Sequence, residues 1–462
     1  MRIFLLLRVL ASSALALAPT GLSFAQHVYV TQLYSFDGTN GANPIYSNLV
    51  QGRDGLLYGT TVYGGVNNAG AIFKIDTSGN ITLLHSCNSS TGWYPWGGLV
   101  LGPDGNFYGT TSTGGAGSFG VIFKITPTGT YTVLHNFTYY PTGGGYPYGG
   151  LVLAEDGSFY GVTDFGGAGE GGVLYRITSA GQFTVIYSYD YTVSSNAQVA
   201  PVQGANGNFY VVSIEGGANG FGSVTEVSPR GALVNAFSFD GETEGKYPVG
   251  SVAQGFDGDF YGSTDQAGAV PGGVLFKVDA NLDYTVLEDF GAIAGGGTDP
   301  ESGMVLATDK NLYGLTLGGG SRDFGTIYRV TPDGTLNNIF GWTVNVQAQA
   351  AMVQQTNGTL YGVTYSGGNF GLGIVYSLSL GLGPFVTFVG ATGKAGQTAE
   401  ILGQGLIGTT YVTFNGVPAT SFSVVSDTYM TAVVPSGATA GPVVVTAPGG
   451  ALTSNVSFRI IN

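Results

Sequence analysis

Short apolar runs separated by glycine-rich turns recur along most of the chain. In one stretch, residues 99–101 form an apolar run, Pro103-Asp104-Gly105 forms a tight turn, and residues 106–111 form a second run. A glycine loop and two more strand-like runs, 121–125 and 131–135, follow. Glycine adopts positive φ without strain, so Asp-Gly and Pro-x-Gly sequences favour hairpin turns. The pattern predicts four antiparallel strands joined in order, which is the up-and-down blade of a propeller.

The same pattern returns along the chain. Leu56-Leu57-Tyr58-Gly59-Thr60-Thr61 recurs as Asn106-Phe107-Tyr108-Gly109-Thr110-Thr111. The central tyrosines of the copies are Tyr58, Tyr108, Tyr160, Tyr210, Tyr261, Tyr313 and Tyr361. They lie 48 to 52 residues apart, which suits propeller blades, since related repeats run about 40–50 residues. We predict an all-β protein with a seven-bladed β-propeller in residues 26–380.

The N-terminal end of the repeat region supplies a strand that the C-terminal end lacks. The seventh copy has strands near 351–354, 360–364 and 373–378, but no fourth strand follows. Residues 28–37 are an unpaired fourth-strand sequence that matches the copy around residues 236–241. We predict that this N-terminal strand completes the last blade and closes the ring, which removes two open sheet edges.

The repeat stops at about Pro384. Residues 384–462 contain seven or so short apolar runs separated by turns with Gly and Pro. That length and pattern are typical of an immunoglobulin-like β-sandwich. The segment has no Cys pair and no Trp, so we do not expect an antibody-type domain.

Composition narrows the class of protein. The chain of 462 residues has 81 Gly, 13% aromatic residues and 9% charged residues, which excludes simple disorder, because disorder needs few aromatics and high charge. The net charge of −14 makes nucleic acid and anionic membranes poor partners, since they are bound mainly through Lys and Arg. The single cysteine, Cys87, cannot form an intramolecular disulfide and stands where other copies carry Phe, so we expect a buried apolar group.

The N-terminus indicates export. Arg2 precedes an apolar stretch from residue 3 to residue 18 that Arg8 interrupts, and Ser23-Phe24-Ala25 offers small residues for cleavage. We predict a signal peptide of residues 1–25, cleaved after Ala25, and a secreted or cell-surface protein. A membrane-anchoring helix is the alternative, but Arg8 leaves a run shorter than the roughly 20 residues that span a bilayer. The mature chain is expected to have no transmembrane helix.

The repeat resembles a known family. Asp104-Gly105-Asn106-Phe107-Tyr108-Gly109-Thr110-Thr111, Gly114-Gly115 and Gly120-Val121-Ile122-Phe123-Lys124-Ile125 resemble the GloVer tandem repeat of bacterial exported proteins termed choice-of-anchor proteins. The resemblance covers roughly residues 33–380. The fourth copy departs from it at Tyr210-Val211, and the fifth has Ala267 for the first Gly of the pair. The resemblance implies a surface anchor that varies among members and implies no catalytic residues.

The C-terminal segment is similar to IPT/TIG domains. The likeness is carried by Gly393-Lys394-Ala395-Gly396-Gln397-Thr398, Ile401-Leu402-Gly403, Val412-Thr413-Phe414-Asn415-Gly416-Val417-Pro418-Ala419 and Val433-Val434-Pro435-Ser436-Gly437-Ala438. Intracellular relatives touch DNA. Because residues 384–462 have only Lys394 and Arg459 as basic residues, we expect no nucleic-acid binding.

The loops are expected to lie on two faces. Successive turns of an antiparallel meander lie on opposite sides, so the tight turns share one face, the turn face. The glycine loops and the loops between blades share the other, the loop face. Two inter-blade loops of the loop face are aromatic, and they contain Trp93, Tyr94, Trp96, Tyr139, Tyr140, Tyr146 and Tyr148.

Flat aromatic rings stack on sugar rings and lose little conformational entropy on binding. We therefore predict glycan-binding residues, which are Trp93, Trp96, Tyr139 and Tyr140. The alternative is that these rings wedge neighbouring blades together. Tyr94, Tyr146 and Tyr247 each precede Pro at an equivalent place, which favours the structural role for those three.

Acidic residues and histidines are the remaining candidates for metal binding or catalysis. Asp257-Gly258-Asp259 is interpreted as a hairpin turn, because calcium needs six to eight oxygen ligands. We expect no metal and no cofactor. His85 and His135 occupy equivalent repeat positions, which favours a scaffold role. Asp164, Glu215 and Asp265 follow second strands at equivalent places. An alternative interpretation is therefore that two of these carboxylates meet as the catalytic pair that glycoside hydrolysis needs.

We therefore expect an exported, non-catalytic binding or structural protein. Its function would be glycan binding or surface adhesion through the loop face, with an extracellular polysaccharide or a cell-surface component as partner. No nucleophile elbow, metalloprotease helix or phosphate loop is present in the sequence. Two alternatives stay open: a polysaccharide-degrading enzyme with its carboxylates on the loop face, and a scaffold for protein partners.

Overall fold

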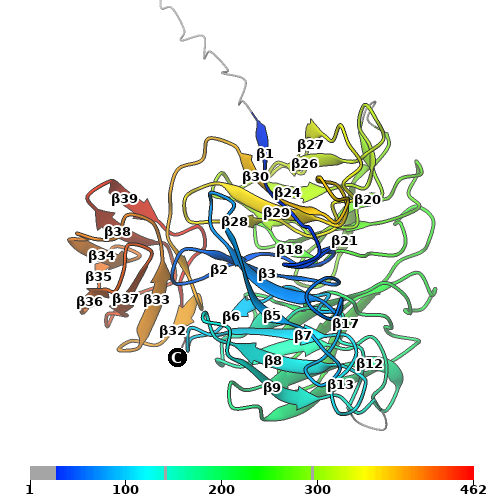
Figure 1. The fold of residues 1–462 in the computed structure, drawn as a ribbon, viewed down its shortest axis with the longest axis horizontal. Helices are drawn as coiled ribbons and strands as arrows, with labels where there is room; N and C mark the ends of the chain where they lie inside the picture. The colour runs from blue at the N-terminus through cyan, green and yellow to red at the C-terminus, as the bar shows by residue number, and fades with distance from the viewer. Residues whose placement is uncertain (1–27, 140–142, 293–295, 462) are drawn as a thin grey trace, which may run out of the picture.

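The computed structural model describes residues 28–139, 143–292 and 296–461. Every regular element in these ranges is a β-strand, so the predicted all-β class is confirmed (Figure 1). Among the same residues, no helix is long and apolar enough to cross a membrane.

Seven four-stranded antiparallel sheets make up the described repeat region, and we number them sheet 1 to sheet 7 in chain order. Sheets 1 to 3 consist of β2 (Val50–Gln51), β3 (Leu57–Thr61), β4 (Ala71–Ile75) and β5 (Ile81–Ser86); β6 (Val100–Leu101), β7 (Phe107–Thr111), β8 (Val121–Ile125) and β9 (Tyr131–Asn136); and β10 (Val152–Leu153), β11 (Phe159–Val162), β12 (Glu170–Ile177) and β13 (Phe183–Asp190). Sheets 4 and 5 consist of β14 (Val202–Gln203), β15 (Phe209–Ser213), β16 (Ser223–Val227) and β17 (Leu233–Ser238); and β18 (Ala253–Gln254), β19 (Phe260–Thr264), β20 (Val274–Val278) and β21 (Tyr284–Asp289). Sheets 6 and 7 consist of β23 (Val305–Leu306), β24 (Leu312–Leu315), β26 (Thr326–Val330) and β27 (Leu336–Gly341); and β28 (Val353–Gln354), β29 (Leu360–Thr364), β30 (Ile374–Ser379) and β1 (Tyr29–Ser35). A small pair, β22 (Gly297–Thr298) and β25 (Gly318–Gly319), lies beside sheet 6.

The N-terminal strand completes sheet 7, as the sequence predicted. β1 pairs antiparallel with β30, from Tyr29 opposite Ser379 to Ser35 opposite Ile374. Phe36, which follows β1, is fully buried and meets Phe73 of sheet 1 edge-on, with ring centroids 5.4 Å apart. The two ends of the repeat region are therefore joined by backbone pairing and by a shared apolar core (Figure 1).

The glycine after the repeat tyrosine makes room for an aromatic ring. Gly109 of β7 stands opposite Phe123 of β8, and a Cβ at Gly109 would lie 2.7 Å from the Phe123 ring. The same pairing of Gly with Phe or Tyr occurs in sheets 1, 3, 5, 6 and 7. In sheet 4, Val211 replaces the Gly and stands opposite Thr225, a small residue. The departure seen in the sequence is therefore compensated by its strand partner.

The repeat tyrosine itself joins a turn to the next sheet. Tyr108 donates a hydrogen bond from its hydroxyl to Asp104 of the preceding turn at 2.7 Å, and its ring stacks on Phe159 of sheet 3 at 4.0 Å. The equivalent Asp257 accepts the Tyr261 hydroxyl at 2.8 Å. Such rings bury apolar area and join neighbouring sheets, while the hydroxyl is satisfied at the turn.

Two further four-stranded sheets form the C-terminal part of the chain. They consist of β31 (Thr387–Phe388), β33 (Thr398–Leu402), β37 (Tyr429–Val433) and β36 (Phe422–Val424); and β35 (Val417–Pro418), β34 (Tyr411–Phe414), β38 (Val443–Ala447) and β39 (Gly450–Thr453). A parallel pair, β32 (Thr392–Gly393) and β40 (Arg459–Ile460), accompanies them. Buried residues of both sheets, among them Ile401, Met430 and Val443, belong to one apolar core.

This C-terminal part contacts the turn face of the repeated sheets (Figure 1). Glu400 of β33 forms an ion pair of 2.6 Å with Arg53, in the turn after β2. Arg459 of β40 pairs with Glu155, in the turn after β10. Thr356, in the turn after β28, donates from Oγ1 to the Gly403 carbonyl at 3.0 Å. The turns after the first strands of sheets 1, 3 and 7 thus contact the C-terminal part.

Candidate functional site

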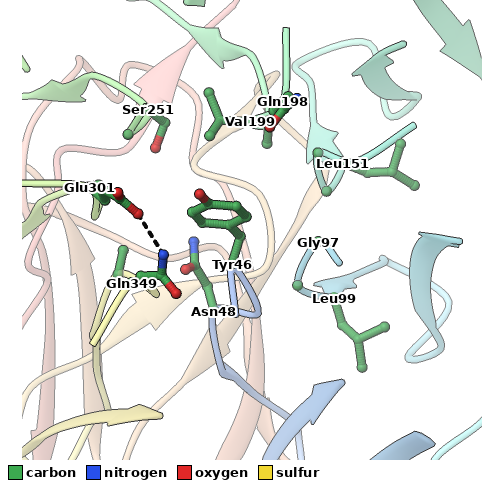
Figure 2. A pocket seen from close by; sticks show the side chains of 17 residues that line it. Tyr46, Asn48, Gly97, Leu99, Leu151, Gln198, Val199, Ser251, Glu301 and Gln349 are labelled. Carbon is green, nitrogen blue, oxygen red and sulfur yellow. Dashed lines mark hydrogen bonds between the residues drawn. The ribbon is translucent and has the colours of Figure 1, made fainter. Parts of the chain in front are cut away.

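The segments that precede the first strands meet at a common axis (Figure 2). Small residues permit the close approach: a Cβ at Gly97 would lie 2.3 Å from the Gly150 backbone of the next sheet, and one at Gly250 would lie 2.5 Å from the Ser302 carbonyl. The space that remains on the axis is a narrow pocket of about 90 Å³.

An arc of aromatic rings lies on one side of this axial pocket. Figure 2 shows the Tyr46 side chain projecting into its middle. The Tyr46 ring stacks on Trp96 of the next sheet at 6.1 Å, and Trp96 meets Tyr148 of sheet 3 edge-on at 5.3 Å. Burial, with the nearby carboxylates of Glu301 and Asp265, raises the pKa of Tyr46 well above its ordinary value. The phenol at the axis is therefore neutral at physiological pH.

Carboxylates lie on the other side. Glu301, which precedes β23, accepts a hydrogen bond of 2.5 Å from the Gln349 side chain (Figure 2). Burial raises the pKa of Glu301 above its ordinary value, the Gln349 hydrogen bond opposes this, and the charges of Asp265 and Asp299 add to it. The pKa of Asp265 is raised in the same direction, first by burial.

Asp164, which follows β11, is the most buried of the acidic candidates. It is 3% exposed, and within the described residues its Oδ1 atom has no hydrogen-bond partner. Burial raises the pKa of Asp164 to about 7; a hydrogen bond with Gln198 opposes the shift and the charge of Glu215 adds to it. A carboxyl group of this kind is partly protonated at neutral pH and could act as a general acid.

One of the three acidic positions predicted to be equivalent is not. Backbone pairing places Glu215 opposite Ser195 and Gln266 opposite Lys246. Glu215 therefore corresponds to Gln266, one residue beyond Asp265, whereas Asp164 and Asp265 share a repeat position. Because successive residues of an extended chain point to opposite sides, Glu215 cannot present its carboxylate as the other two do.

The predicted residue Trp93 borders a separate groove on the loop face of sheet 2. The groove has a volume of about 770 Å³, and the Trp93 side chain is 39% exposed. Its other lining residues are Ser89, Ser90, Tyr94, Thr113, Gly114, Gly115, Ala116, Ser118, Val133 and Asn136. An exposed indole beside exposed hydroxyls is the combination that stacks on and hydrogen-bonds to a sugar.

The other predicted glycan-binding residues lie elsewhere. Trp96 belongs to the aromatic arc of the axial pocket, where it bridges Tyr46 and Tyr148. Tyr139 packs on Phe119 at 5.1 Å and directs its hydroxyl to Glu170 at 3.5 Å. These contacts fit the alternative in which the rings wedge neighbouring sheets. Tyr140 lies outside the described residues.

The histidines and the cysteine take the places that the repeat indicated. His135 stacks on Phe183 of sheet 3 at 3.9 Å, as Phe237 stacks on Tyr284 at 4.4 Å. Burial lowers the pKa of His135 to about 4. Cys87 is fully buried, and burial raises the pKa of its thiol to about 12, so the thiol is neutral and shielded.

No group of three or more His, Cys, Asp or Glu side chains that could hold a metal ion is found in the residues described. In the predicted turn, Asp257 accepts the Tyr261 hydroxyl. Asp259 pairs with Lys277 at 2.8 Å. Both carboxylates are thus engaged by the protein.

Three residues of these sites were not found from the sequence. Tyr46 and Glu301 reach the axial pocket only because the ring brings sheets 1 and 6 together. Asn136 is visible in the sequence as an exception to the repeat, because the equivalent residues at the ends of the other fourth strands are mostly Ser. An alignment of the fourth strands would have singled it out.

The chain matches solved propeller structures at low identity. It is similar to streptogramin B lyase, with 13% identity and a TM-score of 0.53 over 76% of this chain and 97% of the lyase. It is also similar to the extracellular domains of two putative hybrid two-component systems of B. thetaiotaomicron, with 13% and 11% identity and TM-scores of 0.50 and 0.51. These two matches include 94% and 91% of this chain. They include 55% and 46% of the two extracellular domains, so this chain spans about half the length of each. At such identity the likeness shows the fold alone.

No curated protein matches the chain. The family model described as the Gloeobacter/Verrucomicrobia repeat matches residues 21–201 and 148–347, which together cover more than half of the chain. The chain therefore belongs to the Gloeobacter/Verrucomicrobia repeat family.

Proposed function

We propose that this is an exported, non-catalytic binding protein that holds a polysaccharide or another cell-surface component through its loop face. The observation that carries the proposal is the open groove beside Trp93, where an exposed indole borders a space of about 770 Å³. The C-terminal part occupies the turn face through the ion pairs of Arg53 and Arg459. We therefore place the ligand on the loop face, where the groove lies.

Size favours the groove over the axial pocket. Ligand pockets are commonly about 300–1,000 Å³, and the axial pocket has about 90 Å³. Tyr46 lines this pocket, its ring contacts Trp96, and Trp96 in turn contacts Tyr148. We therefore assign the arc to packing between sheets and the groove to the ligand.

The architecture is proposed in the same terms. Residues 26–380 form a seven-bladed propeller closed by β1, which the seven sheets and the pairing of β1 with β30 support. Residues 384–462 form an immunoglobulin-like domain of the IPT/TIG type, which two four-stranded sheets around one core support. A signal peptide of residues 1–25 would be cleaved after Ala25 and would deliver the protein to the exterior or the cell surface.

An enzyme is the second candidate, because Asp164 has a pKa of about 7 and Asp265 occupies the same repeat position two sheets away. A general acid of that pKa suits glycoside hydrolysis. The narrow axial pocket argues against it, since a sugar ring needs more room than about 90 Å³.

A glycan array with purified residues 26–462, run beside a reducing-sugar release assay, tests both candidates. We expect binding to at least one polysaccharide without sugar release. Trp93→Ala should abolish the change in tryptophan fluorescence on titration with that polysaccharide. Trp342→Phe should preserve this change, because Trp342 follows β27 of sheet 6 and is buried in an apolar core. Sugar release that is lost in Asp164→Asn would show that the protein is an enzyme and not a non-catalytic binding protein. Absence of binding to every glycan of the array would refute glycan binding.

A further inference from the structure

The indole that borders the groove occurs in one copy of the repeat. Backbone pairing in the loops aligns Trp93 with Ala42, Gly145, Ser195, Lys246 and Thr298, and the hydrogen bond from Ser366 to Val346 aligns Val346 with them. Six of the seven copies therefore carry a small, aliphatic or polar residue where sheet 2 carries the indole. A side chain that the repeat does not need for packing is free to serve a ligand.

A second departure from the repeat lies in the same groove. Asn136 ends β9 opposite Val121, and the residues at this register in the other sheets are Ser35, Ser86, Ser188, Ser238, Asp289 and Gly341. The Ser86 and Ser238 hydroxyls accept a hydrogen bond from the backbone of their glycine loops at 3.1 and 3.0 Å. Asn136 does the same with Oδ1, which accepts from the Ala116 N–H at 2.7 Å.

The amide of Asn136 therefore adds something that serine lacks. Serine uses its one oxygen for the loop, and the structural task is complete. Asparagine performs that task with Oδ1 and retains Nδ2, a donor of two hydrogen bonds, at the wall of the groove. Trp93 and Asn136, two departures from one repeat, meet in one cavity.

The charge of the groove limits its ligand. Its lining residues are Ser, Trp, Tyr, Thr, Gly, Ala, Val and Asn, with no Asp, Glu, Lys, Arg or His among those described. An acidic sugar would enter without a cationic partner, against a protein of net charge −14. An amino sugar would find no carboxylate to pair with its ammonium group. Uncharged sugars lose no ionic solvation on entering such a site.

We infer that sheet 2 holds a single binding site for an uncharged saccharide, in which a sugar ring stacks on Trp93 and a sugar hydroxyl accepts a hydrogen bond from Asn136 Nδ2. The inference rests on the proposed glycan-binding function and adds the ligand class, the stoichiometry and the donor. One site in a ring of seven sheets means that a polysaccharide is held by each protein molecule at one point.

The test is isothermal titration calorimetry of residues 26–462 with neutral hexasaccharides of glucose, mannose and xylose, and with charged hexamers of galacturonate and glucosamine. We expect at least one neutral hexasaccharide to bind with about one site per chain, and the charged hexamers to bind at least tenfold more weakly. Trp93→Ala should weaken binding about tenfold or more. Asn136→Ser should weaken it about three- to tenfold, the loss of one hydrogen bond.

The variants are matched to the repeat. Sheet 1 has Ala42 at the position of Trp93 and Ser86 at the position of Asn136. Trp93→Ala and Asn136→Ser therefore introduce residues that the repeat already accepts, and both variants should keep the wild-type melting temperature. Ser195→Ala, at the Trp93 position of sheet 4, is the control and should bind as the wild type does.

The outcomes distinguish failure of the inferred site at Trp93 from failure of glycan binding as a whole. Neutral binding at one site that both variants weaken supports the inference. Charged hexamers that bind as tightly as the neutral ones, several sites per chain, or unchanged binding by Trp93→Ala would overturn the inference while leaving glycan binding in place. No binding of any saccharide, on the array or in the calorimeter, would overturn both.

Discussion

Sheets 2 and 4 both depart from the repeat, and their surroundings differ. In sheet 4 the departure is internal: Val211 takes the place of a glycine, and its strand partner Thr225 takes the place of an aromatic ring. In sheet 2 the departures, Trp93 and Asn136, border an open groove. A departure that is matched by a packed neighbour preserves the fold, whereas we propose that the departures facing the groove serve a ligand.

Copying the internal pair of sheet 4 into sheet 2 should give the largest effect on stability. Gly109→Val would place a Cβ 2.7 Å from the Phe123 ring. Overpacking of this kind costs about 3 kcal/mol of unfolding free energy, measured by urea denaturation. Adding Phe123→Thr, which copies the pair of sheet 4, should recover at least half of the loss. A double variant no more stable than Gly109→Val would show that the two positions are not coupled.

Asp164 gives a second, smaller test, because it is a buried carboxyl group whose Oδ1 has no hydrogen-bond partner among the described residues. Its pKa in the folded state is about 7, raised from 3.8, so between pH 4 and pH 7 the folded chain binds more protons than the unfolded chain. Stability therefore falls as pH rises through this window.

Asp164→Asn, which imitates the protonated acid, should be on the order of 2 kcal/mol more stable than the wild type at pH 8 and about equal to it at pH 4. Urea denaturation at the two pH values measures both. A variant less stable than the wild type at pH 8 would show that the charged carboxylate has a stabilising partner.

Asn136→Ser should give the smallest change in stability. The serine hydroxyl can accept the Ala116 N–H as Ser86 and Ser238 accept theirs. We expect the free energy of unfolding to change by less than about 0.5 kcal/mol. A loss above 1 kcal/mol would mean that the amide serves the glycine loop itself, and Ser86→Asn, the reverse change in sheet 1, would show whether the loop prefers an amide.

The repeat explains how much of the molecule the sequence predicts. Spacing of the tyrosines and of the Asp-Gly turns is local information, and it located all seven sheets and the closing strand. The Val211 departure was visible, but its reason was not, because Thr225 opposes it only in the folded register. Glu215 was misplaced by one residue, since its register is set by pairing with Ser195 across a loop.

Contacts between distant parts were beyond the sequence. Tyr46 and Glu301 are 255 positions apart, and the ring alone places them at one axis. The pairing of Arg53 with Glu400 depends on how the C-terminal sheets dock. Of the candidate ligand residues, Trp93 borders a groove and is 39% exposed, although its ring lies 6.1 Å from that of Tyr94. Trp96 and Tyr139 pack on rings from other loops.

A crystal structure of residues 26–462 with the tightest-binding neutral hexasaccharide would show directly whether the saccharide binds at sheet 2. We predict one saccharide per chain, with a sugar ring lying flat on the Trp93 indole and a hydroxyl within hydrogen-bond distance of Asn136 Nδ2. Saccharide seated in the axial pocket beside Tyr46, or on sheets other than sheet 2, would contradict it.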